Sequence, residues 1–214
     1  MSKRMSVGVP LLAASLVLAL PHLAWSQADA VDPHAQHQAP VGTNPRVSTA
    51  DYLLPQVSLV RDDGKRVSLS AELDDGRPVV LNFIYTTCPG ICPLMSQVFS
   101  QFQRRLGAER GKVHMVSISI DPEQDTPARL RDYAKKFRAG TQWQHYTGTV
   151  EASVQVQKAF DAYRGDKMGH DPLTLMRAAP GSPWVRMDGF ASASDLFDQY
   201  RNLAGVGSTK MAVN

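Results

Sequence analysis

Cysteine is scarce in this chain, with two residues among 214. That number excludes a small scaffold stapled by several disulfides. No run of lysines and arginines occurs, which argues against a nucleic-acid partner. Hydrophobic residues make up 43% and charged residues 20% of the chain, values that are ordinary for a globular protein. A disordered chain, a collagen and a multi-span membrane protein are therefore excluded as well.

One sustained apolar run is present, near the N-terminus, between Val7 and Leu20. It follows two basic residues and precedes Ala24-Trp25-Ser26, a pattern typical of a secretory signal peptide. The run is shorter than the roughly 20 apolar residues of a membrane-crossing helix. We predict that residues 1–26 are a signal peptide, with an N-terminal membrane anchor as the alternative. Both alternatives predict a periplasmic location, either free or anchored to the inner membrane.

Three further segments follow from composition. Residues 27–50 are rich in Ala, Gln, Pro, His and Thr without apolar periodicity, and are predicted to form a flexible tether. His34 and His37 have a spacing that could bind a metal, but we expect them to be solvated and dispensable. Globular patterning predicts one folded domain over residues 51–206, followed by a C-terminal tail over residues 207–214.

The folded part alternates strand and helix signals. A turn at Asp62-Asp63-Gly64-Lys65 between two apolar segments predicts a β-hairpin. The other predicted elements are strands over residues 79–85, 113–119, 173–177 and 184–187, and helices after the cysteines, after Thr126-Pro127, over 150–163 and over 194–203. This order predicts an α/β class, a thioredoxin-like fold with an added N-terminal β-hairpin.

The two cysteines lie in Thr86-Thr87-Cys88-Pro89-Gly90-Ile91-Cys92-Pro93. Each precedes a proline, which disfavours helical geometry, so we expect Cys92 to be a helix N-cap with Pro93 in the first helical position. Both sulfurs should then face a helix N-terminus, which stabilises a thiolate. A fixed disulfide would close almost no loop and would stabilise the fold little. Two thiolates suit copper(I) or zinc, with a third ligand expected from elsewhere.

His170 is the histidine placed to be that third ligand, with a structural role as the alternative. It precedes a strand predicted to run antiparallel to the parallel core strands, which places it at the sheet edge that also carries Cys88. Asp121 follows a parallel strand at the same edge and could orient a histidine or tune a thiol, or could simply be a turn residue. Asp125 is expected to be a turn or capping residue, His114 a structural residue, and His145 part of a surface loop.

These segments together resemble the Sco/SenC family of copper chaperones, over about Leu54 to Leu203. The resemblance is carried by Asp63-Gly64-Lys65, the Asn82–Pro93 segment with its cysteine motif, Ser117–Pro122 with Asp125-Thr126-Pro127, and Thr147-Gly148. It implies a thioredoxin fold that binds one copper ion per domain through Cys88, Cys92 and His170. The family usually has Asp before this His, whereas this chain has Gly169. Met168 could offer a thioether to copper(I), although a solvated loop residue is the alternative.

The resemblance implies a metallochaperone that delivers copper to a respiratory site such as the copper A centre of cytochrome c oxidase. The expected partner is the apo copper A domain, together with another periplasmic copper carrier or a thiol reductant. The main alternative is a thiol–disulfide reductase that keeps the cysteines of that apo site reduced, with Cys88 and Cys92 as its catalytic pair. A peroxide-reducing enzyme is disfavoured because no arginine lies near the cysteines in the sequence.

Overall fold

The computed structural model describes residues 44–205. The predicted signal peptide, His34, His37 and the tail over 207–214 lie outside these residues. Eight strands form a single mixed sheet in the order β1-β8-β7-β4-β5-β6-β2-β3. The strands are β1 (Arg46–Ala50), β2 (Ser58–Arg61), β3 (Arg66–Ser68), β4 (Val79–Ile84), β5 (His114–Ser119), β6 (Trp143–Thr147), β7 (Leu173–Arg177) and β8 (Trp184–Asp188).

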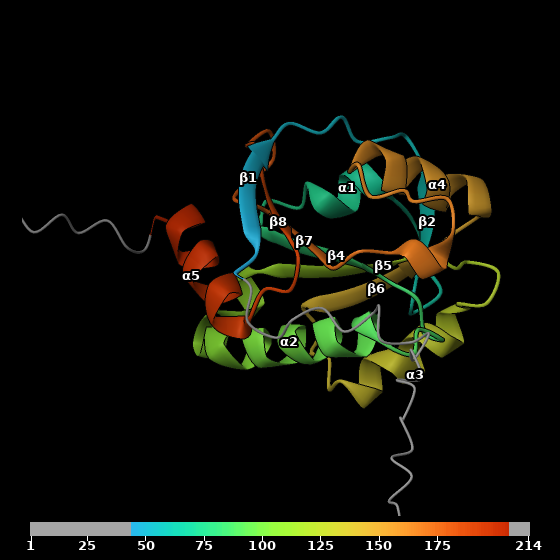
Figure 1. The fold of residues 1–214 in the computed structure, drawn as a ribbon, viewed down its shortest axis with the longest axis horizontal. Helices are drawn as coiled ribbons and strands as arrows, with labels where there is room; N and C mark the ends of the chain where they lie inside the picture. The colour runs from blue at the N-terminus through green and yellow to red at the C-terminus, as the bar shows by residue number, and fades with distance from the viewer. Residues whose placement is uncertain (1–43, 206–214) are drawn as a thin grey trace, which may run out of the picture. The chain divides into compact units, whose positions relative to one another are not determined.

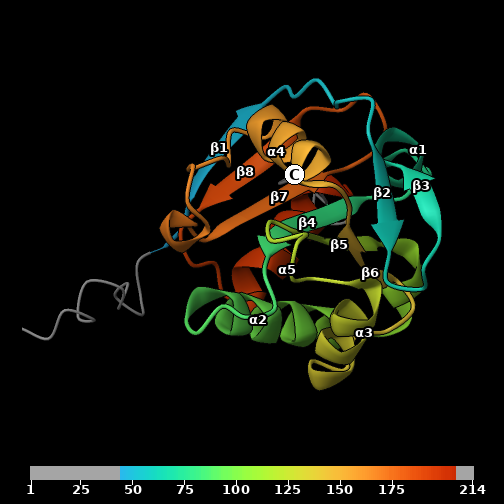
Figure 2. The ribbon, with the colours of Figure 1, turned by 90° about the vertical axis from the view of Figure 1, so that its right-hand side faces the viewer.

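Helices cover both faces of the sheet. On one face lie α2 (Ile91–Leu106), α3 (Pro127–Lys136) and α5 (Ala193–Leu203), and on the other lie α1 (Leu69–Leu73) and α4 (Val150–Ala159) (Figure 1). The view turned by 90° shows the same two layers (Figure 2). None of the helices within residues 44–205 is long and apolar enough to cross a membrane.

The side chains of β4 alternate between the two faces of the sheet, and this explains the two layers of helices. Val80 and Ile84 belong to the core beneath α2, α3 and α5, whereas Leu81 and Phe83 belong to the core beneath α1 and α4. Successive side chains of a strand point to opposite faces, so a strand that is apolar at nearly every position can fill two cores. Asn82 is a buried polar exception, and its side-chain oxygen accepts a 2.7 Å hydrogen bond from Ser117 Oγ.

The strand directions bring the predicted site together. β4 runs parallel to β5, β5 runs parallel to β6, and β7 runs antiparallel to β4. The carboxyl ends of β4 and β5 and the start of β7 therefore share one edge of the sheet. That geometry matches the expectation for Cys88, Asp121 and His170.

The turn at Asp62–Lys65 joins β2 and β3, which pair antiparallel. β2 also pairs with β6, so both strands extend the main sheet.

Two segments form strands that the sequence analysis did not predict. The predicted tether over residues 27–50 extends too far, because Arg46–Ala50 forms β1 and pairs along its length with β8. β1 is short and mostly exposed, so no apolar periodicity marked it. The segment around His145 is not a surface loop but β6, whose residues are mostly buried. Because polar residues interrupt its apolar ones, the sequence did not indicate a strand here, although β6 pairs with β5 on one side and with β2 on the other.

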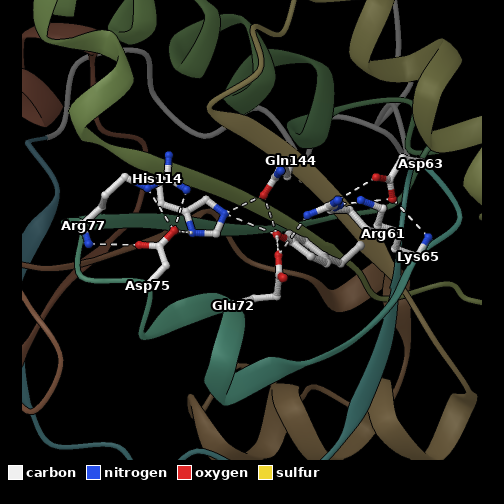
Figure 3. A network of polar contacts seen from close by, with 9 residues as sticks. Arg61, Asp63, Lys65, Glu72, Asp75, Arg77, His114 and Gln144 are labelled. Carbon is white, nitrogen blue, oxygen red and sulfur yellow. Dashed lines mark hydrogen bonds and ion pairs between the residues drawn. The ribbon is translucent and has the colours of Figure 1, made fainter.

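His114 is structural, as predicted. It begins β5, at the opposite end of that strand from the cysteine edge, and Figure 3 shows it within a polar network. Its Nε2 lies 2.9 Å from Gln144 Oε1, and its Nδ1 lies 3.2 Å from Asp75 Oδ2. Tyr146 Oη donates a 2.7 Å hydrogen bond to Glu72 in the same network. These contacts tie α1 to β5 and β6.

Candidate metal centre

The cysteine loop connects the end of β4 to the start of α2. The helix begins at Ile91, with Gly90 as the N-cap, so Cys92 lies in its first turn and is not the N-cap predicted from Pro93. A proline is tolerated there, because the N–H groups of the first turn have no partner within the helix. Both cysteines are free and buried, with Cys88 8% exposed and Cys92 0% exposed. Of the two cysteines, Cys88 is therefore the more exposed.

The helix N-terminus acts on Cys88 as expected. The backbone N–H of Cys92 donates to Cys88 Sγ over 3.4 Å. The Cys92 thiol, followed by the backbone N–H groups of Cys92 and Gly90, lowers the pKa of Cys88 to about 5. The pKa of Cys92 is raised, because its thiol donates to Cys88 and because it is buried. At neutral pH the pair therefore consists of a thiolate at Cys88 and a thiol at Cys92.

His170 lies beside Cys88, as the topology predicted. Both line a pocket of about 110 Å³, together with Tyr85, Pro89, Gly90, Ile91, Lys167 and Met168. His170 Nε2 lies 3.1 Å from the Phe83 carbonyl oxygen. A carbonyl only accepts hydrogen bonds, so Nε2 carries the proton and Nδ1 keeps its lone pair. Burial also lowers the pKa of His170, which keeps the ring neutral. A neutral imidazole with one free nitrogen is a suitable metal ligand.

Among the described residues, Asp121 forms no hydrogen bond or ion pair with the cysteines or with His170. Its Oδ2 lies 2.7 Å from Lys167 Nζ, and its side chain is nearly buried. Lys167 begins the short 3-10 turn η3 (Lys167–Gly169), which ends immediately before His170. Asp121 thus holds the loop that carries His170 through Lys167.

Asp125 was missed by the sequence analysis, which expected a turn or capping residue. It is 0% exposed and accepts hydrogen bonds from Thr86 N, Thr86 Oγ1 and Ser119 Oγ, the last two over 2.5 and 2.6 Å. Thr126, the next residue, is the N-cap of α3. Asp125 therefore joins β5 to the residues that lead into the cysteine loop. Its only sequence signal was its place in the Asp-Thr-Pro segment, which did not reveal the partners.

Tyr85 was also missed, although it directly follows β4. Its hydroxyl donates to Met168 Sδ over 3.5 Å and also contributes to lowering the pKa of Cys88. Burial, with a smaller contribution from the Cys88 thiolate, raises the pKa of Tyr85. Tyr85 could have been recognised from its position at the carboxyl end of a parallel strand, where sites of α/β folds lie.

Cys88 and His170 line one pocket, whereas Cys92 is buried behind it, and the three donors do not form one coordination shell. Within residues 44–205, no three side chains of His, Cys, Asp and Glu lie close enough together to hold a metal ion. The donor types nevertheless fit a soft ion, because thiolates and imidazole are ligands of copper. A metal ion bound by Cys88, Cys92 and His170 would require a local rearrangement of these residues.

Comparison with known proteins identifies the family. Residues 47–179 match the SCO1/SenC family. A SCO1 protein homolog of Bacillus subtilis is 32% identical over 126 residues, which are 58% of this chain and 64% of that protein. A Stutzerimonas stutzeri protein whose name refers to copper binding is 34% identical over 150 residues, 70% of this chain and 67% of that one. The chain thus spans slightly less than two thirds of the Bacillus subtilis relative.

Solved structures agree. Arabidopsis thaliana ScoI with copper bound superposes with a TM-score of 0.58 at 28% identity, covering 68% of this chain and 94% of that chain. A SCO1/SenC family lipoprotein from Bacillus anthracis gives a TM-score of 0.63 at 23% identity, covering 73% and 97%, which supports the fold. The predicted α/β, thioredoxin-like class is confirmed by these structures. The chain belongs to the SCO1/SenC family.

Proposed function

We propose that this protein is an exported metallochaperone that binds one copper ion and delivers it to a respiratory copper site, such as the copper A centre of cytochrome c oxidase. Its main support is the shared pocket of Cys88 and His170, two residues far apart in the sequence. Copper bound to the Arabidopsis thaliana relative supports the choice of metal. The signal-like segment over residues 1–26 supports export to the periplasm, free or anchored to the inner membrane.

The residues have distinct roles in this proposal. Cys88 and Cys92 supply the soft sulfur donors that retain copper(I), and His170 supplies a neutral nitrogen through Nδ1. The Phe83 carbonyl fixes the ring of His170, and Asp121 holds its loop through Lys167. Cys92 gives up its proton when the metal binds, since the thiolate is the ligand. Because Cys88 borders the pocket, a recipient thiol can approach the metal from that side.

A metal analysis tests the binding step. The reduced protein should hold about one copper ion per chain, because two thiolates and an imidazole complete one site. A Cys92→Ser variant should lose most of this copper, whereas replacement by Ala of Ser48, an exposed residue of β1 that does not line the pocket, should not. Retention of the full copper content after replacement of both cysteines would overturn the proposal.

A second function is supported by the different burial of the two cysteines. As a thiol–disulfide reductase, the Cys88 thiolate would attack one sulfur of an acceptor disulfide and release the other as a thiolate. Cys92 would then lose its proton, attack Cys88 of the mixed disulfide and release the second acceptor thiolate. Two electrons reach the acceptor, and the resulting Cys88–Cys92 disulfide must be reduced again by an external thiol.

A further inference from the structure

Met168 is not among the ligands proposed above, yet it lies at the same pocket as two of them. Its side chain is 56% exposed. The other methionines within residues 44–205 are buried, namely Met95, Met115, Met176 and Met187. An isolated exposed apolar residue is common on protein surfaces. Met168, however, lines the 110 Å³ pocket that also holds Cys88 and His170.

The position of Met168 is held by several contacts. Its backbone N–H donates to the Asp166 side chain over 2.9 Å. On one side, Lys167 is bound to Asp121, and its Nζ lies 5.7 Å from the centre of the Tyr85 ring. Two residues further on, His170 is bound to the Phe83 carbonyl. The turn is thus attached at both ends, and the side chain between them borders the pocket.

The thioether is aligned with the thiolate through one hydroxyl group. Tyr85 Oη donates to Met168 Sδ over 3.5 Å and also stabilises the Cys88 thiolate. Tyr85, Cys88 and Met168 therefore lie around the same pocket, with the Tyr85 hydroxyl group near both sulfurs. A thioether sulfur has two lone pairs, so the contact with Tyr85 leaves one available for a metal.

We propose that Met168 is a thioether ligand for copper(I) in this pocket. The inference rests on the proposed copper-binding function and adds a ligand to it. Thioethers select copper(I), whereas imidazole also suits copper(II). Met168 would therefore strengthen the binding of copper(I) and contribute little to copper(II). As a neutral ligand on an exposed side chain, it can leave the ion without a proton transfer and make room for an incoming thiol.

The test is the affinity of the full protein for copper(I), measured by competition with a colorimetric copper(I) chelator. Met168→Leu keeps the apolar bulk and removes the sulfur. Its affinity for copper(I) should fall about tenfold or more, the range seen when a metal site loses a supporting contact. The affinity for copper(II) should not change. Met187→Leu is the matched control, because it removes a buried methionine by the same, generally tolerated, exchange.

X-ray absorption at the copper edge provides an independent readout. The copper(I) form should show three sulfur neighbours in the parent protein and two in Met168→Leu. If the parent binds copper(I) with two sulfurs and Met168→Leu has the same affinity, the Met168 proposal is wrong while the copper-binding function stands. If the parent binds no copper, both proposals fail.

Discussion

At the scale of single residues, the site depends on groups that never touch a metal. Asp125 is a buried carboxylate that receives hydrogen bonds from Thr86 and Ser119, and so joins the end of β5 to the cysteine loop. Tyr85 holds Met168 through a hydrogen bond to its sulfur, and the Phe83 carbonyl holds the ring of His170. The residues of the proposed site are thus positioned by polar contacts, and loss of one partner of a buried contact has a large cost.

Replacement of Asp125 by Asn should destabilise the protein. The amide oxygen can accept hydrogen bonds but the NH2 group cannot, so at least one donor of Thr86 or Ser119 loses its partner. The free energy of unfolding should fall by about 1–3 kcal/mol, as for a buried unsatisfied group, measured by urea denaturation. Asp132→Asn removes the same charge from an exposed side chain of α3 and should change it by less than about 0.5 kcal/mol. Equal effects of the two substitutions would contradict this role of Asp125.

At the scale of elements, β6 places a histidine in the core. His145 is 0% exposed and its ring stacks on Trp143, with centroids 5.2 Å apart. Tyr133 of α3 meets the ring edge-on, and Asp62 Oδ2 lies 3.8 Å from Nδ1. Neither ring nitrogen has a hydrogen-bond partner, and burial lowers the pKa of His145 to about 3. The ring is therefore neutral in the folded protein.

This histidine should make stability depend on pH. Below an unfolded pKa of about 6.5, the unfolded chain binds a proton that folded His145 takes up only near pH 3, so stability falls as the pH decreases through this window. Between pH 6.5 and 5 the loss should be about 1–2 kcal/mol, since one pH unit corresponds to at most about 1.4 kcal/mol per group.

Urea denaturation at several pH values, comparing the parent with His145→Leu, measures the contribution of His145 directly. The half-buried carboxylate of Asp62 and the other histidines titrate in both proteins, so the difference between the two curves isolates His145. The same pH dependence in both would show that His145 is protonated in the folded state.

At the scale of the whole molecule, the sheet separates two cores and leaves the cysteine loop at one edge. The cysteines belong to the core beneath α2, α3 and α5, and Cys88, unlike Cys92, borders the 110 Å³ pocket. A partner of the proposed site would approach at the edge where β4 and β5 end and β7 begins. This arrangement would suit copper transfer and thiol exchange equally, so the fold alone does not separate the two proposed functions.

His170→Ala separates these two functions. A histidine ligand matters for metal transfer, whereas thiol exchange depends on the thiolate and its accessibility. For a chaperone, the variant should deliver at least about tenfold less copper to a reduced apo copper A domain, while it still reduces the oxidised domain at nearly the parental rate. Copper uptake by the acceptor is followed by its absorption spectrum, and reduction by thiol counting. If copper-free parent protein restores the oxidised domain while copper-loaded protein transfers nothing to the reduced one, the reductase function is supported.

Much of this protein could be predicted from local sequence. The hairpin turn at Asp62–Lys65, the Thr126 cap and the buried β4 strand depend on neighbouring residues, and the structure contains each of them. The stabilised thiolate could likewise be predicted from the cysteine motif, because placing a thiolate at a helix N-terminus needs only a few adjacent residues. The shared edge of Cys88 and His170 followed from strand directions alone.

The remaining features depend on contacts between distant segments. β1 and β6 have weak apolar patterns and form because β8 on one side and β5 with β2 on the other offer unpaired backbone groups. Asp125 has the same local sequence whether it is a surface turn or a buried acceptor, and its donors on β5 and at the end of β4 decide between them. Met168 borders the pocket because Asp121 and Phe83 hold its turn. Tertiary structure decided these positions, since hydrogen bonds between distant segments form only after the chain has folded.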